Sequence, residues 1–85
     1  MHAIEFTKQA AQALKAMPRN MAITIREKIN ALAVDPYAPN PSARKLAGRD
    51  GYRLRVGDWR VLYQIEDRRL VIVVLAVKPR GDAYK

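Results

Sequence analysis

The stretch "GYRLRVGDWRVLYQ" (residues 51–64) predicts a β-hairpin that decides the fold. Polar and apolar side chains alternate over 52–56 and again from 59 to about 66, and Gly57-Asp58 is typical of a two-residue hairpin turn. This register pairs Val56 with Trp59 and places Arg55 directly opposite Arg60. Because like charges opposed in this way repel, this register is unfavourable unless an anion lies between the two arginines.

The same alternation divides the hairpin into two faces. One face is apolar and aromatic and can receive helices: Tyr52, Leu54, Trp59, Val61, Tyr63 and Ile65. The other face carries Arg53, Arg55, Arg60 and Gln64. We therefore expect one helix-covered face and one uncovered, basic face.

The N-terminal half predicts a short strand and two helices. Residues 2–6 can form the strand, after which Thr7 caps a helix that runs to about residue 17 and stops at Pro18. A second helix is expected from about 20 to 34, because apolar residues recur there at helical spacing. Its buried stripe is Met21, Ile25, Ile29 and Leu32. Residues 35–43 contain three prolines and predict an irregular connector.

The last strand is expected at about 70–77, after a turn at Asp67-Arg68. It is apolar on both faces, which is typical of a central strand. The predicted order is therefore β-α-α-β-β-β. We expect an α+β fold in which a small antiparallel sheet carries the two N-terminal helices on one face, as a single domain over 1–85.

The charge is concentrated in the C-terminal half. The net charge is +8, and residues 44–85 carry eleven basic side chains, most of them arginine, against five acidic ones. Arginine matches phosphate oxygens in a bidentate way, so this bias favours contact with nucleic acid, although a solvated basic surface would have the same composition. The chain contains no cysteine, and its longest apolar run is too short to span a membrane. No secretory signal is expected, because the first residues lack a basic segment followed by an apolar run. A cytoplasmic protein without membrane partners is expected.

Few residues are suited to catalysis. The single histidine, His2, stands near the N-terminus, and no group of residues has metal-ligand or cofactor-binding spacing, so neither a metal nor a cofactor is predicted. Arginine, lysine and tyrosine remain. They suit RNA cleavage by the RNA's own 2'-hydroxyl, which requires alignment and stabilisation of negative charge. Arg80 and Tyr84 lie four residues apart after the last strand, where a frayed basic tail is the alternative.

Residues 44–84, "RKLAGRDGYRLRVGDWRVLYQIEDRRLVIVVLAVKPRGDAY", resemble the RelE/ParE superfamily of toxins from bacterial toxin-antitoxin modules, and the RelE-like branch most closely. The combination of "KLAG", "YRLRVGDWRVLYQI" and Arg-x3-Tyr after an apolar strand carries this resemblance. The family fold, a small antiparallel sheet backed by helices, agrees with the elements predicted above. RelE-like members enter the ribosomal A site and cut mRNA, whereas ParE-like members poison DNA gyrase.

The resemblance implies roles for individual residues. Arg60 matches an arginine that stabilises the transition state, Arg80 a phosphate ligand or general acid, and Tyr84 a tyrosine near the scissile step. The expected catalytic residues are Arg55, Arg60, Arg80 and Tyr84, and the expected RNA-binding residues are Lys45, Arg53, Arg55 and Lys78. Many relatives have lysine at 53 and 55, histidine at 79 and arginine at 81. Arginine at 53 and 55 does not readily lose a proton, so no general base is expected there. Pro79 and Gly81 predict slower cleavage, with charge stabilisation intact.

The implied function is that of a toxin acting as a ribosome-dependent, metal-independent mRNA endonuclease that inhibits translation. Its partners would be the ribosome, mRNA and a cognate antitoxin, expected to be acidic and partly disordered. Two alternatives stay open from the sequence. The chain can instead be a ParE-like inhibitor of DNA gyrase, or a catalytically inactive domain that binds RNA or the antitoxin.

Overall fold

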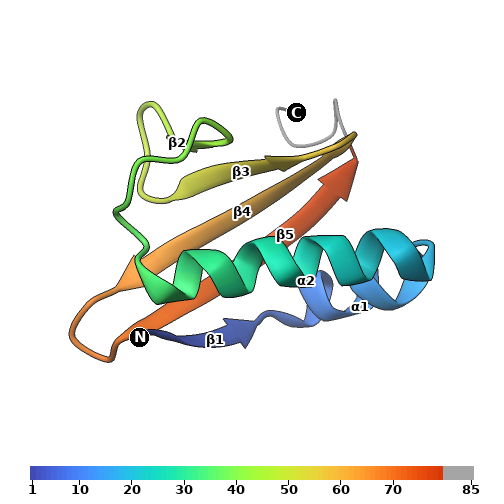
Figure 1. The fold of residues 1–85 in the computed structure, drawn as a ribbon, viewed down its shortest axis with the longest axis horizontal. Coiled ribbons are helices and arrows are strands. Elements are labelled where there is room, and N and C mark those ends of the chain that lie inside the picture. The colour runs from blue at the N-terminus through green and yellow to red at the C-terminus, as the bar shows by residue number, and fades with distance from the viewer. Residues whose placement is uncertain (80–85) are drawn as a thin grey trace.

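The computed structural model describes residues 1–79, which form two helices and five strands (Figure 1). In chain order the elements are β1 (Ala3–Phe6), α1 (Lys8–Ala16), α2 (Arg19–Val34), β2 (Ala43–Lys45), β3 (Tyr52–Val56), β4 (Trp59–Glu66) and β5 (Val71–Pro79). This architecture confirms the predicted α+β class and the two N-terminal helices. Arg80 and Tyr84, two of the expected catalytic residues, lie outside the described residues.

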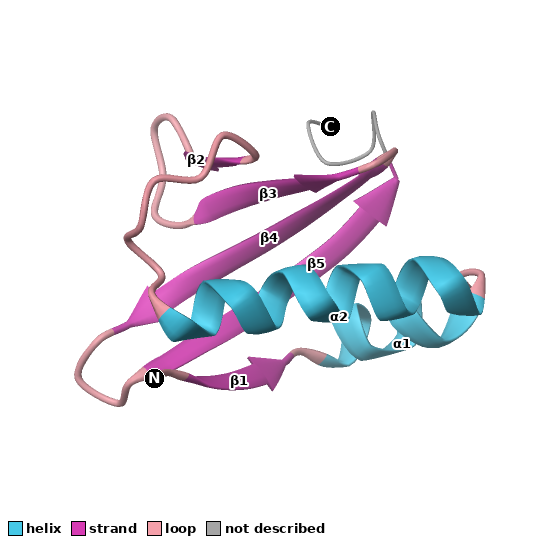
Figure 2. Cartoon of the chain, viewed as in Figure 1, coloured by secondary structure: helices cyan, strands magenta, loops and turns pink. Residues whose placement is uncertain are grey.

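The strands form one sheet in the order β1-β5-β4-β3-β2 (Figure 2). β5 lies between β1 and β4 and is therefore an interior strand, as its apolar sequence predicted. The β3-β4, β4-β5 and β2-β3 pairs are antiparallel. Two features differ from the expectation. β1 pairs with β5 in parallel, so the sheet is mixed. The connector also ends in an additional strand, β2, which pairs with β3.

The hairpin register is confirmed. Val56 pairs with Trp59 and Arg55 with Arg60, around a turn at Gly57-Asp58 in which Gly57 has a φ of +57°. Positive φ is strained for residues with a Cβ atom, which explains glycine at this position. The turn therefore fixes which side chains of β3 and β4 share a face.

The core lies between the helices and one face of the sheet (Figure 1). Its buried side chains come from both layers: Ala10, Leu14, Met17, Ile25, Ile29, Leu32, Ala33, Leu54, Val56, Val61, Tyr63, Ile72, Val74 and Val77. Three residues of the predicted apolar stripe of α2 are thus buried, and the remaining one, Met21, is half-buried and packs against this core. The predicted apolar face of the hairpin is thus the face that the helices cover.

Two side chains at the start of α1 form hydrogen bonds with the backbone of β5, on the side of the strand that faces β1. Pairing of β1 with β5 ends at Phe6, and the Thr7 hydroxyl then donates a hydrogen bond to the carbonyl of Leu75 (2.6 Å). The Gln9 amide accepts from the backbone N–H of Val77 (3.2 Å) and donates to its carbonyl (3.4 Å). These bonds satisfy backbone groups of β5 beyond the reach of β1.

Candidate functional site

Three basic side chains form a row across the centre of the sheet. Arg55 of β3 pairs with Arg60 of β4, which pairs in turn with Lys78 of β5. Directly paired residues have Cβ atoms about 4.5–5.5 Å apart, so three positive charges are neighbours on the face opposite the helices. An anion bound to this row would relieve the repulsion between them.

Arg60 is buried, with only 4% of its surface exposed, whereas Arg55 is exposed and Lys78 is half-buried. The expectation of an uncovered basic face is therefore wrong at Arg60, because alternation predicts the face of a side chain but not its depth. A buried charge acts through a lower effective dielectric than an exposed one, so the Coulomb attraction between the Arg60 guanidinium and a neighbouring anion is stronger than at an exposed arginine.

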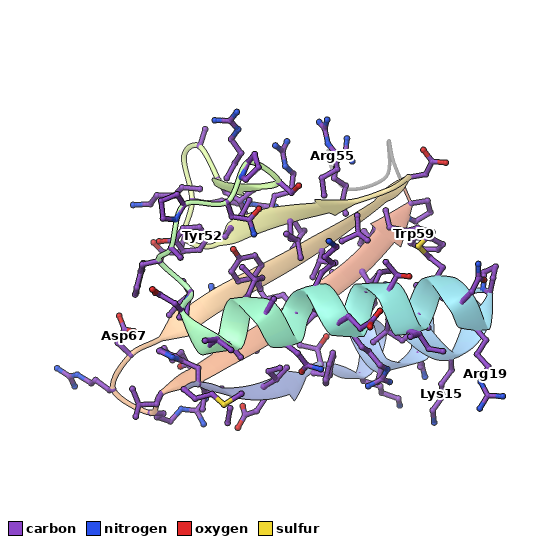
Figure 3. All side chains as sticks on the ribbon, in the orientation of Figure 1. Lys15, Arg19, Tyr52, Arg55, Trp59 and Asp67 are labelled. Carbon is purple, nitrogen blue, oxygen red and sulfur yellow. The ribbon has the colours of Figure 1, made fainter. Side chains whose placement is uncertain are left out.

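A second basic group lies beside this row, at the edge of the sheet. Arg44 of β2 pairs with Arg53 of β3, and both line a pocket of about 200 Å³. Its remaining lining is Pro41, Ser42 and Arg55. Figure 3 shows Arg55 projecting from β3, at the opposite side of the molecule from Lys15 and Arg19. The arginines of three strands therefore meet on one face.

Arg44 was not among the residues expected from sequence, because β2 itself was not expected. The signal available was weak: in "ARK" (43–45) a small apolar residue precedes two basic ones, which is too short for a recognisable alternation. Pairing with β3 turns Ala43 toward the core and Arg44 toward the arginines.

Lys45 is the one described candidate that lies apart from the others. It pairs with Tyr52, whose ring stacks on Tyr63 of the core with centroids 5.4 Å apart. Lys45 lines a separate pocket of about 280 Å³ together with Tyr37 and Tyr52. Successive strand residues face opposite sides, so Lys45 is on the helix side while Arg44 is not. The structure thus groups Arg53, Arg55, Arg60 and Lys78, and leaves Lys45 outside this group.

Three chain segments meet at Asp67, far from Arg55 (Figure 3). The Tyr37 hydroxyl donates to Asp67 Oδ2 (2.5 Å), and His2 Nε2 lies 3.2 Å from Asp67 Oδ1. The hydrogen bond to the carboxylate raises the pKa of Tyr37 to about 12, and the bonds from Tyr37 and His2 lower the pKa of Asp67. These contacts fasten the connector and the N-terminus to the β4-β5 turn, a structural role.

Within residues 1–79, no three His, Cys, Asp or Glu side chains gather as metal ligands would. No helix in the same range is long and apolar enough to cross a bilayer. A larger, mainly apolar pocket of about 410 Å³ lies beside Met17, Trp59 and Val77. Among the described residues, Lys78 is the one basic residue in its lining and no arginine lines it, so it is less suited to an anion than the pocket beside Arg44 and Arg53.

Comparison with known proteins identifies the family. The model of the family described as "ParE toxin of type II toxin-antitoxin system, parDE" matches residues 4–84. The chain belongs to this toxin family. The toxin is also 33% identical to Toxin RelG of Mycobacterium tuberculosis, over 99% of this chain and 97% of that protein. The predicted RelE/ParE resemblance, and its RelE-like character, are confirmed.

Solved structures show the same fold. The toxin superimposes on a chain of the archaeal RelE-RelB complex from Pyrococcus horikoshii with a TM-score of 0.81 and 32% identity, covering 94% of this chain and 96% of that one. A chain of the intact Escherichia coli RelBE complex gives a TM-score of 0.81 at 19% identity, covering 95% and 99%. At that identity the likeness concerns the fold alone.

Proposed function

We propose that this toxin is a ribosome-dependent mRNA endonuclease that inhibits translation without a metal or cofactor. The observation that carries the proposal is the row Arg55, Arg60 and Lys78, in which a buried guanidinium stands between two further positive charges. The kinship with RelE-like toxins supports the same reading. Its place of action would be the cytoplasm.

The proposed reaction draws its nucleophile from the substrate. The 2'-hydroxyl of one nucleotide loses its proton to water and attacks the adjacent phosphorus. The 5'-oxygen of the next nucleotide leaves and takes up a proton, so the products carry a 2',3'-cyclic phosphate and a 5'-hydroxyl. The protein must hold these atoms in line and stabilise the added negative charge. Arg60 is suited to this task, because a preorganised charge withdrawn from water needs little rearrangement during the reaction.

The flanking residues would have distinct roles. Arg55 and Lys78 would bind the phosphate and, with Arg53, the neighbouring RNA backbone. Arg55 cannot accept the proton of the 2'-hydroxyl, because its guanidinium is permanently protonated. The family resemblance adds Arg80 as a phosphate ligand or general acid and Tyr84 near the scissile bond. Lys45 would contact the RNA from the helix-covered side of the sheet.

We also propose a cognate antitoxin as partner. The solved relatives include toxin-antitoxin complexes from Pyrococcus horikoshii and Escherichia coli. A net charge of +8 favours an acidic partner, which would cover the basic face and compete with RNA. Co-expression and purification should recover a complex that dissociates more readily at high salt.

Mapping mRNA ends after brief expression tests the function. Breaks within translated codons, in wild type but not in Arg60→Ala, are the expected result. A second candidate function, inhibition of DNA gyrase, is kept because the matched family model is that of ParE toxins. Intact mRNA together with a supercoiling defect would support this alternative, and intact mRNA with normal supercoiling would support an inactive binding domain.

A further inference from the structure

We propose that Arg44 and Arg53, with Pro41 and Ser42, form a second phosphate subsite that binds a backbone phosphate adjacent to the one being cleaved. The inference rests on the proposed nuclease function and extends it. It assigns a role to Arg44 and predicts that the toxin engages at least two successive phosphates of the mRNA.

The Arg44–Arg53 pair and the Arg55–Arg60 pair are offset from each other along β3. Arg53 and Arg55 lie two residues apart on β3 and share one face, which separates them by about 6.6–6.8 Å. Each is paired with another arginine, Arg53 with Arg44 on β2 and Arg55 with Arg60 on β4. The step between these pairs is comparable with the separation of neighbouring phosphates along an extended single strand. One RNA strand can therefore contact both groups.

The wall of the subsite is held in place by backbone hydrogen bonds. Ser42 N–H donates to Asn40 Oδ1 (2.9 Å), Ala43 N–H donates to the Asn40 carbonyl (3.1 Å), and the Ser42 carbonyl accepts from Arg55 N–H (2.8 Å). Pro41 further restricts this segment. The pocket is thus formed before a ligand arrives, which lowers the entropic cost of binding.

The pocket favours phosphate over the carboxylates of an antitoxin. Three guanidiniums line it, and it is mainly polar, with little apolar surface on which an amphipathic protein segment could pack. The pocket also adjoins the row of Arg55, Arg60 and Lys78, because Arg55 lines the pocket and pairs with Arg60. A ligand that follows both groups must repeat its negative charge at short intervals, as a nucleic-acid backbone does.

A binding experiment separates the subsite from the chemistry. We would measure the affinity of the full-length toxin for a 2'-O-methylated RNA hexamer, which cannot cleave itself, by fluorescence anisotropy over a series of salt concentrations. Loss of one phosphate contact to single-stranded RNA reduces the slope of log K against log salt by about 0.7. Arg44→Gln should show this reduction, Arg44→Lys should retain the slope, and Lys15→Gln on α1 should match wild type.

The subsite is overturned by an unchanged slope in Arg44→Gln or by the absence of hexamer binding in wild type. It is also overturned if Arg44→Gln weakens antitoxin binding alone, since the pocket would then be a carboxylate site. Failure of the nuclease proposal looks different. Wild-type toxin would then leave ribosome-bound mRNA intact while the slope still falls in Arg44→Gln. Because Arg44 is exposed, its replacement should leave the fold unchanged by circular dichroism.

Discussion

Arg55 and Arg60 lie directly opposite each other on neighbouring strands, the first exposed and the second almost completely buried. Directly opposed like charges destabilise a sheet. An anion that binds between the two guanidiniums would relieve this repulsion. Such preorganised charge is the largest single contribution in many enzymes that stabilise a charged transition state.

Replacing Arg55 should therefore stabilise the free toxin. We expect Arg55→Gln to increase the free energy of unfolding by about 0.2–1 kcal/mol, the usual size of a cross-strand pair, and to weaken RNA binding. Urea denaturation at low salt measures the effect, and high salt should diminish it. Arg19→Gln, on an exposed residue at the far side of the molecule, is the matched control. A less stable Arg55→Gln variant would contradict the repulsion argument.

Arg60 should matter for the chemical step. Loss of one donor that stabilises a transition state typically lowers the rate about 10²- to 10³-fold, which is the result expected for Arg60→Ala. Arg60→Lys keeps the charge but loses the bidentate fork, so it should retain part of the activity. Single-turnover cleavage of ribosome-bound mRNA distinguishes the variants, after near-UV circular dichroism has confirmed their fold. Wild-type rates in Arg60→Ala would exclude this residue from the reaction.

The Thr7 side chain should contribute to stability in two ways. Its oxygen accepts a hydrogen bond from Ala10 N–H (3.3 Å) as the N-cap of α1, and its hydroxyl donates to the Leu75 carbonyl. Thr7→Val should cost about 1–2 kcal/mol, measured by urea unfolding. The same change at Thr24 removes only an exposed bond to the Asn20 carbonyl, so Thr24→Val should be nearly neutral. Equal effects at the two positions would refute a special role for Thr7.

Asp67 should confer a pH dependence on stability. Hydrogen bonds from Tyr37 and His2 lower its pKa in the folded protein below the ordinary value of 3.8. Its contribution is therefore complete above the pKa of the unfolded chain and is lost as the pH falls through the folded pKa. Tyr37→Phe should raise the pKa of the Asp67 carboxyl, observable by carbon NMR titration, without changing RNA binding to the arginines. An unchanged pKa would show that the Tyr37 bond is absent in solution.

Local patterns accounted for most of the fold. The alternation in β3 and β4 and the Gly57-Asp58 turn predicted the register that opposes Arg55 and Arg60, since each feature acts over a few residues. The parallel pairing of β1 could not be predicted in the same way. It depends on contacts between the two ends of the chain, which no local pattern encodes.

The sequence predicted which face of the sheet carries the site, but not how deeply each side chain is buried or which residues β2 adds. Period-two alternation located Arg53, Arg55 and Arg60 on one face, and Lys78, an expected RNA-binding residue, joins them through its pairing with Arg60. The burial of Arg60 depends on the surrounding three-dimensional packing, which alternation does not report. Arg44 and Lys45 show how much depends on one strand: only the register of β2 reveals that these neighbours face opposite sides.

The pairing of β1 with β5 also sets when this protein can first complete its sheet. Thr7 and Gln9 contact residues 68 positions later in the chain, and β1 has its only sheet partner in β5 among residues 1–79. A ribosome adding about 5–20 residues per second needs roughly 3–14 s to make the intervening segment. During that interval β1 cannot yet pair with β5. The row of Arg55, Arg60 and Lys78 consequently cannot be complete until β5 has emerged from the ribosome.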